Sequence, residues 1–105
     1  MQMPLFALTY RYVDDIALIT EHRSEHRAYL RRLAEEGDLV LAGGLGEPGP
    51  PSGLLILDVE SVEDAEKVAD NDPFQSRGII TERSVQPWAV SIGGDRLGPD
   101  ASRAG

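Results

Sequence analysis

Alternating apolar and polar positions along the chain predict four β-strands. The first strand covers residues 4–12, and its strongly apolar face carries Phe6, Leu8, Tyr10 and Tyr12. The stretch 53–59 is apolar on both faces, so we expect it in the middle of a sheet. Further strands are expected at 39–44 and at 79–91. The last one should end near a sheet edge, because Pro87 has no N–H to donate.

Helical spacing predicts the elements between these strands. The segment 15–36 reads as helical up to a stop at Gly37, but its pattern fits either one continuous helix or two pieces that break near residues 20–24. A second helix is expected over 61–72. The sequence DPFQSRG then predicts one more helical turn, with Asp72 as its N-cap. Residues 93–105 lack periodicity and are expected to be a disordered tail behind a single domain, 1–92.

The predicted order of elements is β-α-β-β-α-β. This order is typical of an α+β fold of the ferredoxin-like type, in which two helices cover one face of an antiparallel sheet. The first, third and fourth strands also carry apolar residues on the opposite face. Because an uncovered apolar face is unfavourable in water, we expect a second copy to cover it and form a homodimer through the sheet faces.

Composition narrows the classes of function. The chain has 105 residues and no cysteine, which excludes a disulfide framework, a thiolate nucleophile and a cysteine-ligated metal. Its formal net charge of −8 opposes binding to nucleic acid and to anionic membranes. The N-terminal stretch lacks the basic and apolar regions of a secretory signal or membrane span, so a cytoplasmic protein is expected.

His26 is the main candidate for chemistry. It shares a predicted helix face with Leu30 and Leu33, where an apolar side chain would be usual. One interpretation is a core histidine bonded to a backbone carbonyl, and the other is a general base oriented by a carboxylate. Asp72 is the candidate carboxylate, although a cap role alone also explains Asp-Pro. The two roles are compatible, since one carboxylate oxygen can accept from an amide while the other accepts from an imidazole.

Other candidates carry weaker signals. His22 and His26 are spaced i, i+4, but no third ligand has a diagnostic spacing, so neither a metal nor another cofactor is predicted. Arg23 is a candidate for binding an anionic substrate, and the favoured alternative is an ion pair with Glu21 or Glu25 on a solvated helix face. Aromatic residues that suit either a ligand pocket or a core or dimer interface are Tyr10, Tyr12, Phe74 and Trp88.

Several stretches together resemble the YciI-like (YCII-related) family. They are RSEHRAYL, LVLAGG, GLLIL and SVEDA, followed by D-P-F…G…V-x-P-W, and the similarity covers about residues 5–90. The resemblance implies a ferredoxin-like fold assembled as a dimeric α/β barrel. It also implies an active-site pair of His26 and Asp72, with Arg23 matching the family's arginine. The chain departs from the family at Gly44-Leu45, where Gly-Pro is frequent.

The residues and the resemblance lead to one hypothesis and one alternative. The hypothesis is a small cofactor-independent lyase or isomerase that moves a proton on a small cyclic or carbonyl-containing metabolite. His26 is the expected acid–base group and Asp72 its orienting partner, while Arg23 lies near any anionic group. The alternative is a non-catalytic ligand-binding or regulatory dimer, in which the same pair only fixes residues 72–78 against the first helix.

Overall fold

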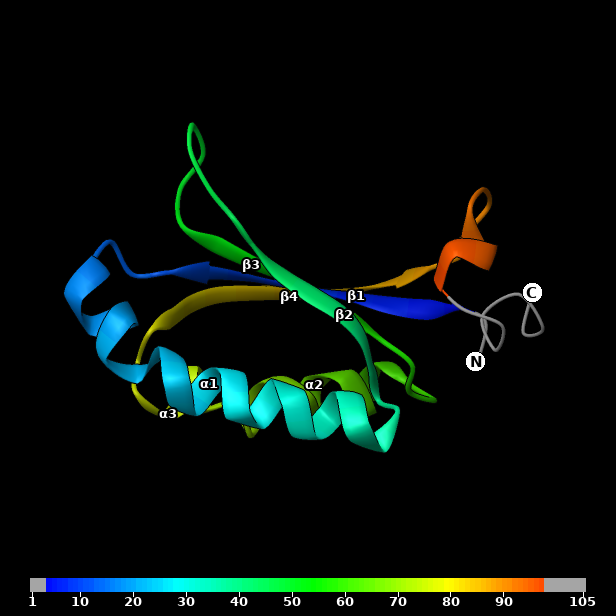
Figure 1. Cartoon of the computed structure of the whole chain (residues 1–105), viewed down its shortest axis with the longest axis horizontal. Coiled ribbons are helices and arrows are strands. Elements are labelled where there is room, and N and C mark those ends of the chain that lie inside the picture. Colours follow the sequence, from blue (N-terminus) through cyan, green and yellow to red (C-terminus); the bar gives the residue numbers. More distant parts are fainter. Residues whose placement is uncertain (1–3, 98–105) are drawn as a thin grey trace.

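The computed structural model describes residues 4–97, which form one antiparallel sheet with helices on one side (Figure 1). The strands lie in the order β2-β3-β1-β4, so β3 is internal and β4 is an edge, as predicted. This arrangement confirms the ferredoxin-like α+β fold. The elements are β1 (Leu5–Tyr12), α1 (Ile16–Glu36), β2 (Leu39–Leu45), β3 (Ser52–Leu57), α2 (Val62–Asp70), α3 (Pro73–Ser76), β4 (Ile80–Trp88) and a 3-10 turn η1 (Gly94–Leu97).

The core lies between the helices and one face of the sheet. Strand alternation puts Phe6, Leu8 and Tyr10 of β1 on this face, and their cross-strand neighbours Leu57 and Leu55 of β3 lie beside them. All five side chains are buried. Burying an apolar side chain of this size stabilises the fold by about 1.5–3 kcal/mol, so this face holds the helices on the sheet.

Helix α1 is continuous through residues 20–24, which settles the question that the sequence left open. Asp15 caps its start by accepting a hydrogen bond from the Leu18 N–H at 3.1 Å. Gly37 ends it in the left-handed conformation, with φ of 90°. The helix buries one face against the sheet, with the residues Ile19, His26, Tyr29 and Leu33. Packing along this whole face favours an unbroken helix over the break that its polar middle permitted.

The face of the sheet opposite the helices is less apolar than predicted. Cross-strand pairs on it include Leu5 with Trp88, but also Thr9 with Ser84 and Arg11 with Glu82. Two large apolar side chains on this face are partly exposed: Trp88 at 41% and Leu41 of β2 at 46%. The alternation rule identified the two faces of β1 correctly. It overestimated the apolar character of β4, whose residues on this side are mostly polar.

The C-terminal region differs from the uniform tail that was predicted over 93–105. Gly94–Leu97 forms the turn η1, supported by a hydrogen bond from the Arg96 N–H to the Gly93 carbonyl at 3.0 Å. Residues 98–105 lie outside the described range. None of the helices within residues 4–97 combines the length and the apolar character that crossing a membrane requires.

Candidate active site

His26 and Asp72, 46 residues apart in sequence, meet in the interior between α1 and α3. The imidazole Nδ1 lies 2.8 Å from the Asp72 Oδ1, and both residues are buried. An ionised carboxylate can only accept hydrogen bonds, so the shared proton belongs to Nδ1. The neutral ring then carries its lone pair on Nε2, which has no hydrogen-bond partner within the described chain. The pair therefore presents an oriented proton acceptor.

Asp72 makes both of the contacts that its local sequence allowed. It is the N-cap of α3, and its Oδ1 also accepts the Phe74 N–H at 2.9 Å. Pro73 occupies the first helical position, where a missing N–H costs nothing. One oxygen thus takes both hydrogen bonds, whereas two separate oxygens were expected. The cap fixes the carboxylate before any ligand arrives.

Tyr10 lies behind the pair and away from the surface. Its hydroxyl and the Asp72 Oδ2 are both buried, and neither has a hydrogen bond of normal geometry to a described residue. Burial, followed by the negative charge of Asp72 and contact with its carboxyl, raises the pKa of Tyr10. The two groups are therefore neighbours that are poorly aligned for a hydrogen bond. A protonated Tyr10 is the group best placed to face the second carboxylate oxygen.

Aromatic rings hold the imidazole in its plane. Phe74 stacks on His26 with ring centroids 4.0 Å apart and planes only 3° from parallel. Tyr12 meets the edge of Phe74 at 5.4 Å and 82°. Burial, with a smaller contribution from the Asp72 charge, raises the pKa of Tyr12 to about 12, although the nearby Arg23 opposes the shift. Tyr12 thus remains a hydrogen-bond donor at neutral pH.

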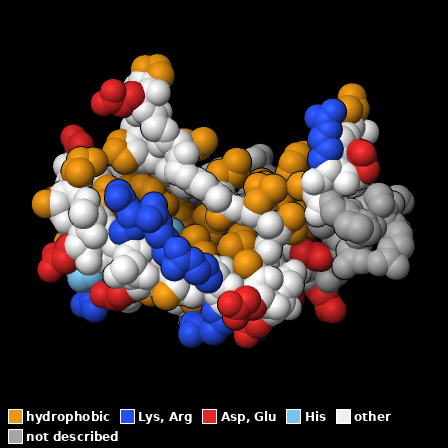
Figure 2. All heavy atoms as spheres, in the orientation of Figure 1, with side chains coloured by type: hydrophobic (Ala, Val, Ile, Leu, Met, Phe, Trp, Pro, Cys, Tyr) orange, Lys and Arg blue, Asp and Glu red, His pale blue; other side chains and the backbone are white. Residues whose placement is uncertain are grey.

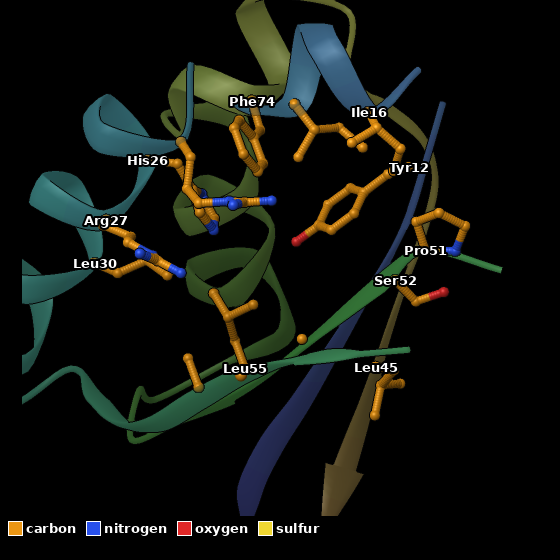
Figure 3. Close-up of a pocket in the computed structure, with 15 residues that line it drawn as sticks. Tyr12, Ile16, His26, Arg27, Leu30, Leu45, Pro51, Ser52, Leu55 and Phe74 are labelled. Carbon is orange, nitrogen blue, oxygen red and sulfur yellow. The ribbon is translucent and has the colours of Figure 1, made fainter. Parts of the chain in front are cut away.

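A cleft of about 520 Å³ opens in front of His26, between α1 and the β2–β3 edge of the sheet. Figure 3 shows His26, Arg27 and Leu30 reaching into it from α1, with Tyr12 opposite and Leu55 below. Phe74 and Arg23 also line it, as the sequence suggested. Its volume is within the range of roughly 300–1,000 Å³ that is typical of small-molecule sites.

Two predicted ligand-contacting residues do not line this cleft. Tyr10 belongs to the buried core next to Asp72 and so does not reach the cleft. Trp88 is paired with Leu5, at the opposite end of β1 from Tyr12, which pairs with Ile80. Of the three aromatic candidates on strands, Tyr12 alone lines the cleft, since aromatic character carries no information on position along a strand. The aromatic residues on the cleft are Tyr12 and Phe74.

The arginines of α1 do not form the predicted ion pairs with glutamates of the same helix. Glu25 instead lies 3.2 Å from the His22 Nδ1 and 3.5 Å from the Arg77 Nη2. The hydrogen bond from His22, with the neighbouring Arg77 charge, lowers the pKa of Glu25. Glu21 also faces His22, at 3.7 Å. These contacts leave Arg23 without a carboxylate partner in the described chain.

The sequence analysis did not identify three residues that line the cleft, namely Arg27, Gly43 and Gly44. Arg27 had been read as part of a solvated face, although its i, i+4 spacing from Arg23 on the His26 side of the helix was a usable signal. Gly43 and Gly44 line the edge-strand wall. Gly44 lies on the helix side of the sheet with its cross-strand partner Gly53, and its missing side chain leaves the cleft open. Among residues 4–97, no group of three or more His, Asp or Glu side chains is arranged to hold a metal ion.

Comparison with known proteins identifies the family of this chain. Residues 3–89 match the model of the YCII-related domain. The chain belongs to the YCII-related family. It is 34% identical over 74 residues to Protein YciI of Escherichia coli O6:H1 and to Protein YciI of Shigella flexneri, covering 63% of this chain and 76% of each relative.

A solved structure supports the fold of this YCII-related chain. It is 5-chloro-2-hydroxyhydroquinone dehydrochlorinase from Burkholderia phenoliruptrix AC1100, in complex with 2,5-dihydroxybenzoquinone. The superposition has a TM-score of 0.74 and covers 83% of this chain and 95% of the other, at 21% sequence identity. At this identity the likeness establishes the shared fold.

Proposed function

We propose that this YCII-related protein is a cofactor-independent lyase or isomerase that uses His26 as its acid–base group. The observation that carries the proposal is the 2.8 Å contact between the His26 Nδ1 and Asp72, on a ring that lines an open cleft. A buried, oriented imidazole beside a small-molecule cleft is the arrangement that general acid–base catalysis requires. Its relative of similar fold, a dehydrochlorinase by name, also acts on a small cyclic compound.

The chemistry follows from the order of the groups. The Nε2 lone pair takes a proton from a substrate C–H or O–H, which leaves the electron pair on the substrate. In an isomerase the imidazolium returns that proton at another atom, and in a lyase the electron pair expels a leaving group. Asp72 stabilises the imidazolium by charge, and the stacked face of Phe74 adds a favourable cation–π contact.

The test combines a binding screen with a proton-exchange assay. Small cyclic and carbonyl compounds, including 5-chloro-2-hydroxyhydroquinone, are screened by thermal shift, and the hits are incubated in D₂O with the protein. NMR then reports product or deuterium entering the substrate. We expect His26→Gln to lower the rate by roughly 10²–10⁴-fold while the protein stays folded. Equal rates for wild type and His26→Gln, or binding without exchange or product, favours the non-catalytic ligand-binding dimer.

We also propose that the protein forms a homodimer through the sheet face opposite the helices. Leu41 and Trp88 are exposed large apolar side chains on that face, and a second copy is a self-complementary cover for them. Light scattering on the purified protein should give twice the 11.4 kDa of the single chain. Leu41→Glu should shift it toward the single-chain mass, and an unchanged assembly in that variant contradicts this face as the interface.

A further inference from the structure

The cleft in front of His26 has a charge opposite to that of the protein as a whole. The chain carries a formal net charge of −8, yet two arginines and no Asp or Glu are found among the described residues that line the cleft. Figure 2 shows basic side chains over α1 beside a recess with a hydrophobic surface. A local positive site on an acidic protein has a specific use, because it attracts anions that the remaining surface repels.

The two arginines of the cleft are Arg23 and Arg27, which are four residues apart on α1. Neither has an ion pair within the described chain. The nearest acids along the helix are already engaged, since both Glu21 and Glu25 face His22. The guanidinium groups therefore keep their hydrogen-bond donors available for a ligand.

The remaining lining sets the shape and polarity of the ligand. Phe74 and Tyr12 present ring faces and edges, and Leu30 and Leu55 are apolar. On the opposite wall, an added Cβ at Gly44, which lies on the helix side of β2, would meet only the Ser52 carbonyl oxygen, at 3.8 Å. A gap between aromatic rings and a bare strand fits a flat apolar body. The arginines fit an anionic group at one end of it.

We infer that the cleft binds small planar organic anions, with Arg23 and Arg27 holding the oxyanion and the aromatic wall holding the ring. Arg23 is the inner contact, since it lies near enough to Tyr12 to oppose the rise in that residue's pKa, and the exposed Arg27 is the outer one. A guanidinium matches a carboxylate or a delocalised enolate through paired N–H donors. The inference names the substrate class of the proposed enzyme and rests on that function only for the reaction itself.

Binding without turnover tests this directly. One-ring carboxylates such as benzoate, salicylate and 2-furoate are titrated by NMR against wild-type protein, each beside its carboxamide, which has the same shape without the charge. We expect the carboxylates to shift the signals of His26 and Phe74 and to bind about tenfold more tightly than the amides. Equal affinity for acid and amide, or no carboxylate binding at millimolar concentration, overturns the inference.

Matched variants assign the effect to the two side chains. Arg23→Gln should weaken carboxylate binding about tenfold and Arg27→Gln about threefold, because water screens the exposed group more. Arg31→Gln lies on the same helix outside the cleft and should leave affinity unchanged. Equal effects of all three variants indicate general surface charge and contradict the site.

The same measurements separate this inference from the proposed function. His26→Gln should keep the preference for acids over amides even though its turnover is lost. A wild-type protein that prefers acids but catalyses no exchange refutes only the catalytic proposal. A protein that turns over a substrate with no dependence on Arg23 or Arg27 refutes only the anion site.

Discussion

The arginine beside α2 and those on α1 differ in whether they have ion-pair partners. On the α2 side, Arg83 of β4 lies 2.6 Å from Asp70 and 3.6 Å from Glu66, and it also bonds Gln75 at 3.2 Å. On the α1 side, Arg23 and Arg27 border an open cleft without a carboxylate partner in the described chain. Ion pairs join α2 to the sheet, whereas the unpaired arginines of α1 border the cleft in which we propose that a ligand binds.

The same contrast occurs within one pair of glycines. Gly44 of β2 and Gly53 of β3 are direct cross-strand partners. A Cβ on Gly53 would collide with the Tyr12 hydroxyl, while a Cβ on Gly44 would meet only a carbonyl oxygen at 3.8 Å. Glycine is required at position 53 because Tyr12 packs against it, whereas glycine at position 44 keeps the cleft open. The molecule thus separates positions that maintain the fold from positions that shape the cleft.

Asp72 belongs to both categories, so its variants should give the largest effects. Asp72→Ala removes the α3 cap and the imidazole partner, and should lower the free energy of unfolding by about 2–3 kcal/mol. Asp72→Asn can still cap α3, so its stability should stay within about 1 kcal/mol of wild type. Both should reduce turnover by roughly 10²-fold, because neither side chain carries the charge that stabilises the imidazolium.

Urea denaturation and initial rates measure these two effects separately. If Asp72→Asn retains wild-type turnover, the carboxylate serves only as the α3 cap, and its charge has no part in stabilising the imidazolium.

The glycine pair should give the next largest effect. Gly53→Ala forces Tyr12 to move and should cost about 1–2 kcal/mol of stability. Gly44→Ala should change stability by less than about 0.5 kcal/mol but weaken ligand binding, since its methyl group enters the cleft. Thermal unfolding with a ligand titration measures both. Similar stability losses at the two positions would show that β2 is as tightly packed as β3.

The arginines should give a smaller difference. Arg83→Gln should lower stability by about 0.5–1 kcal/mol, since its partners are half exposed and such ion pairs contribute little. Arg27→Gln should leave stability within about 0.5 kcal/mol of wild type. Chemical denaturation of both variants makes the comparison. A larger loss for Arg27→Gln than for Arg83→Gln reverses the assignment of binding and structural roles.

Tyrosine ionisation should give the smallest effect, at alkaline pH. The chain has three tyrosines, and burial is the first cause that raises the pKa of each, to about 12 for Tyr12 and Tyr29. A free tyrosine is about half ionised at pH 10. The folded pKa values are raised, so the stability linked to them is complete below pH 10 and is lost as the pH rises toward 12.

Ultraviolet absorbance of tyrosinate should therefore stay low at pH 10 and rise only as the protein unfolds. Asp72→Asn should lower the Tyr12 pKa in part, because burial remains. A wild-type titration centred at pH 10 would show that the tyrosine rings are exposed to solvent and would contradict their burial.

Local patterns were sufficient to predict much of the fold. The period of two identified the buried face of β1, and turn chemistry located Gly37 and the Asp72 cap. Whether α1 continued through residues 20–24 depended on packing of the whole helix against the sheet, which no local signal contains.

The candidate site was predictable only in part, since its groups come from distant segments. Asp72 was a recognisable cap, but its contact with His26 followed from the family resemblance and not from spacing. Whether Arg23 has an ion-pair partner, and how deeply Tyr10 is buried, depend on the neighbours that surround each group in three dimensions. The competition of His22 for Glu21 and Glu25 is such a case. The position of Trp88 along its strand required the register with β1.

The most direct test of the account is the protonation state of the His26 ring. Nitrogen-15 NMR of the imidazole, recorded from neutral to mildly alkaline pH with and without a bound ligand, identifies which nitrogen carries the proton. The account predicts the proton on Nδ1, held by Asp72, and an unprotonated Nε2 whose signal responds to the ligand. A proton on Nε2 in the neutral ring, or a signal that ignores every ligand bound in the cleft, contradicts the role of His26 as the base.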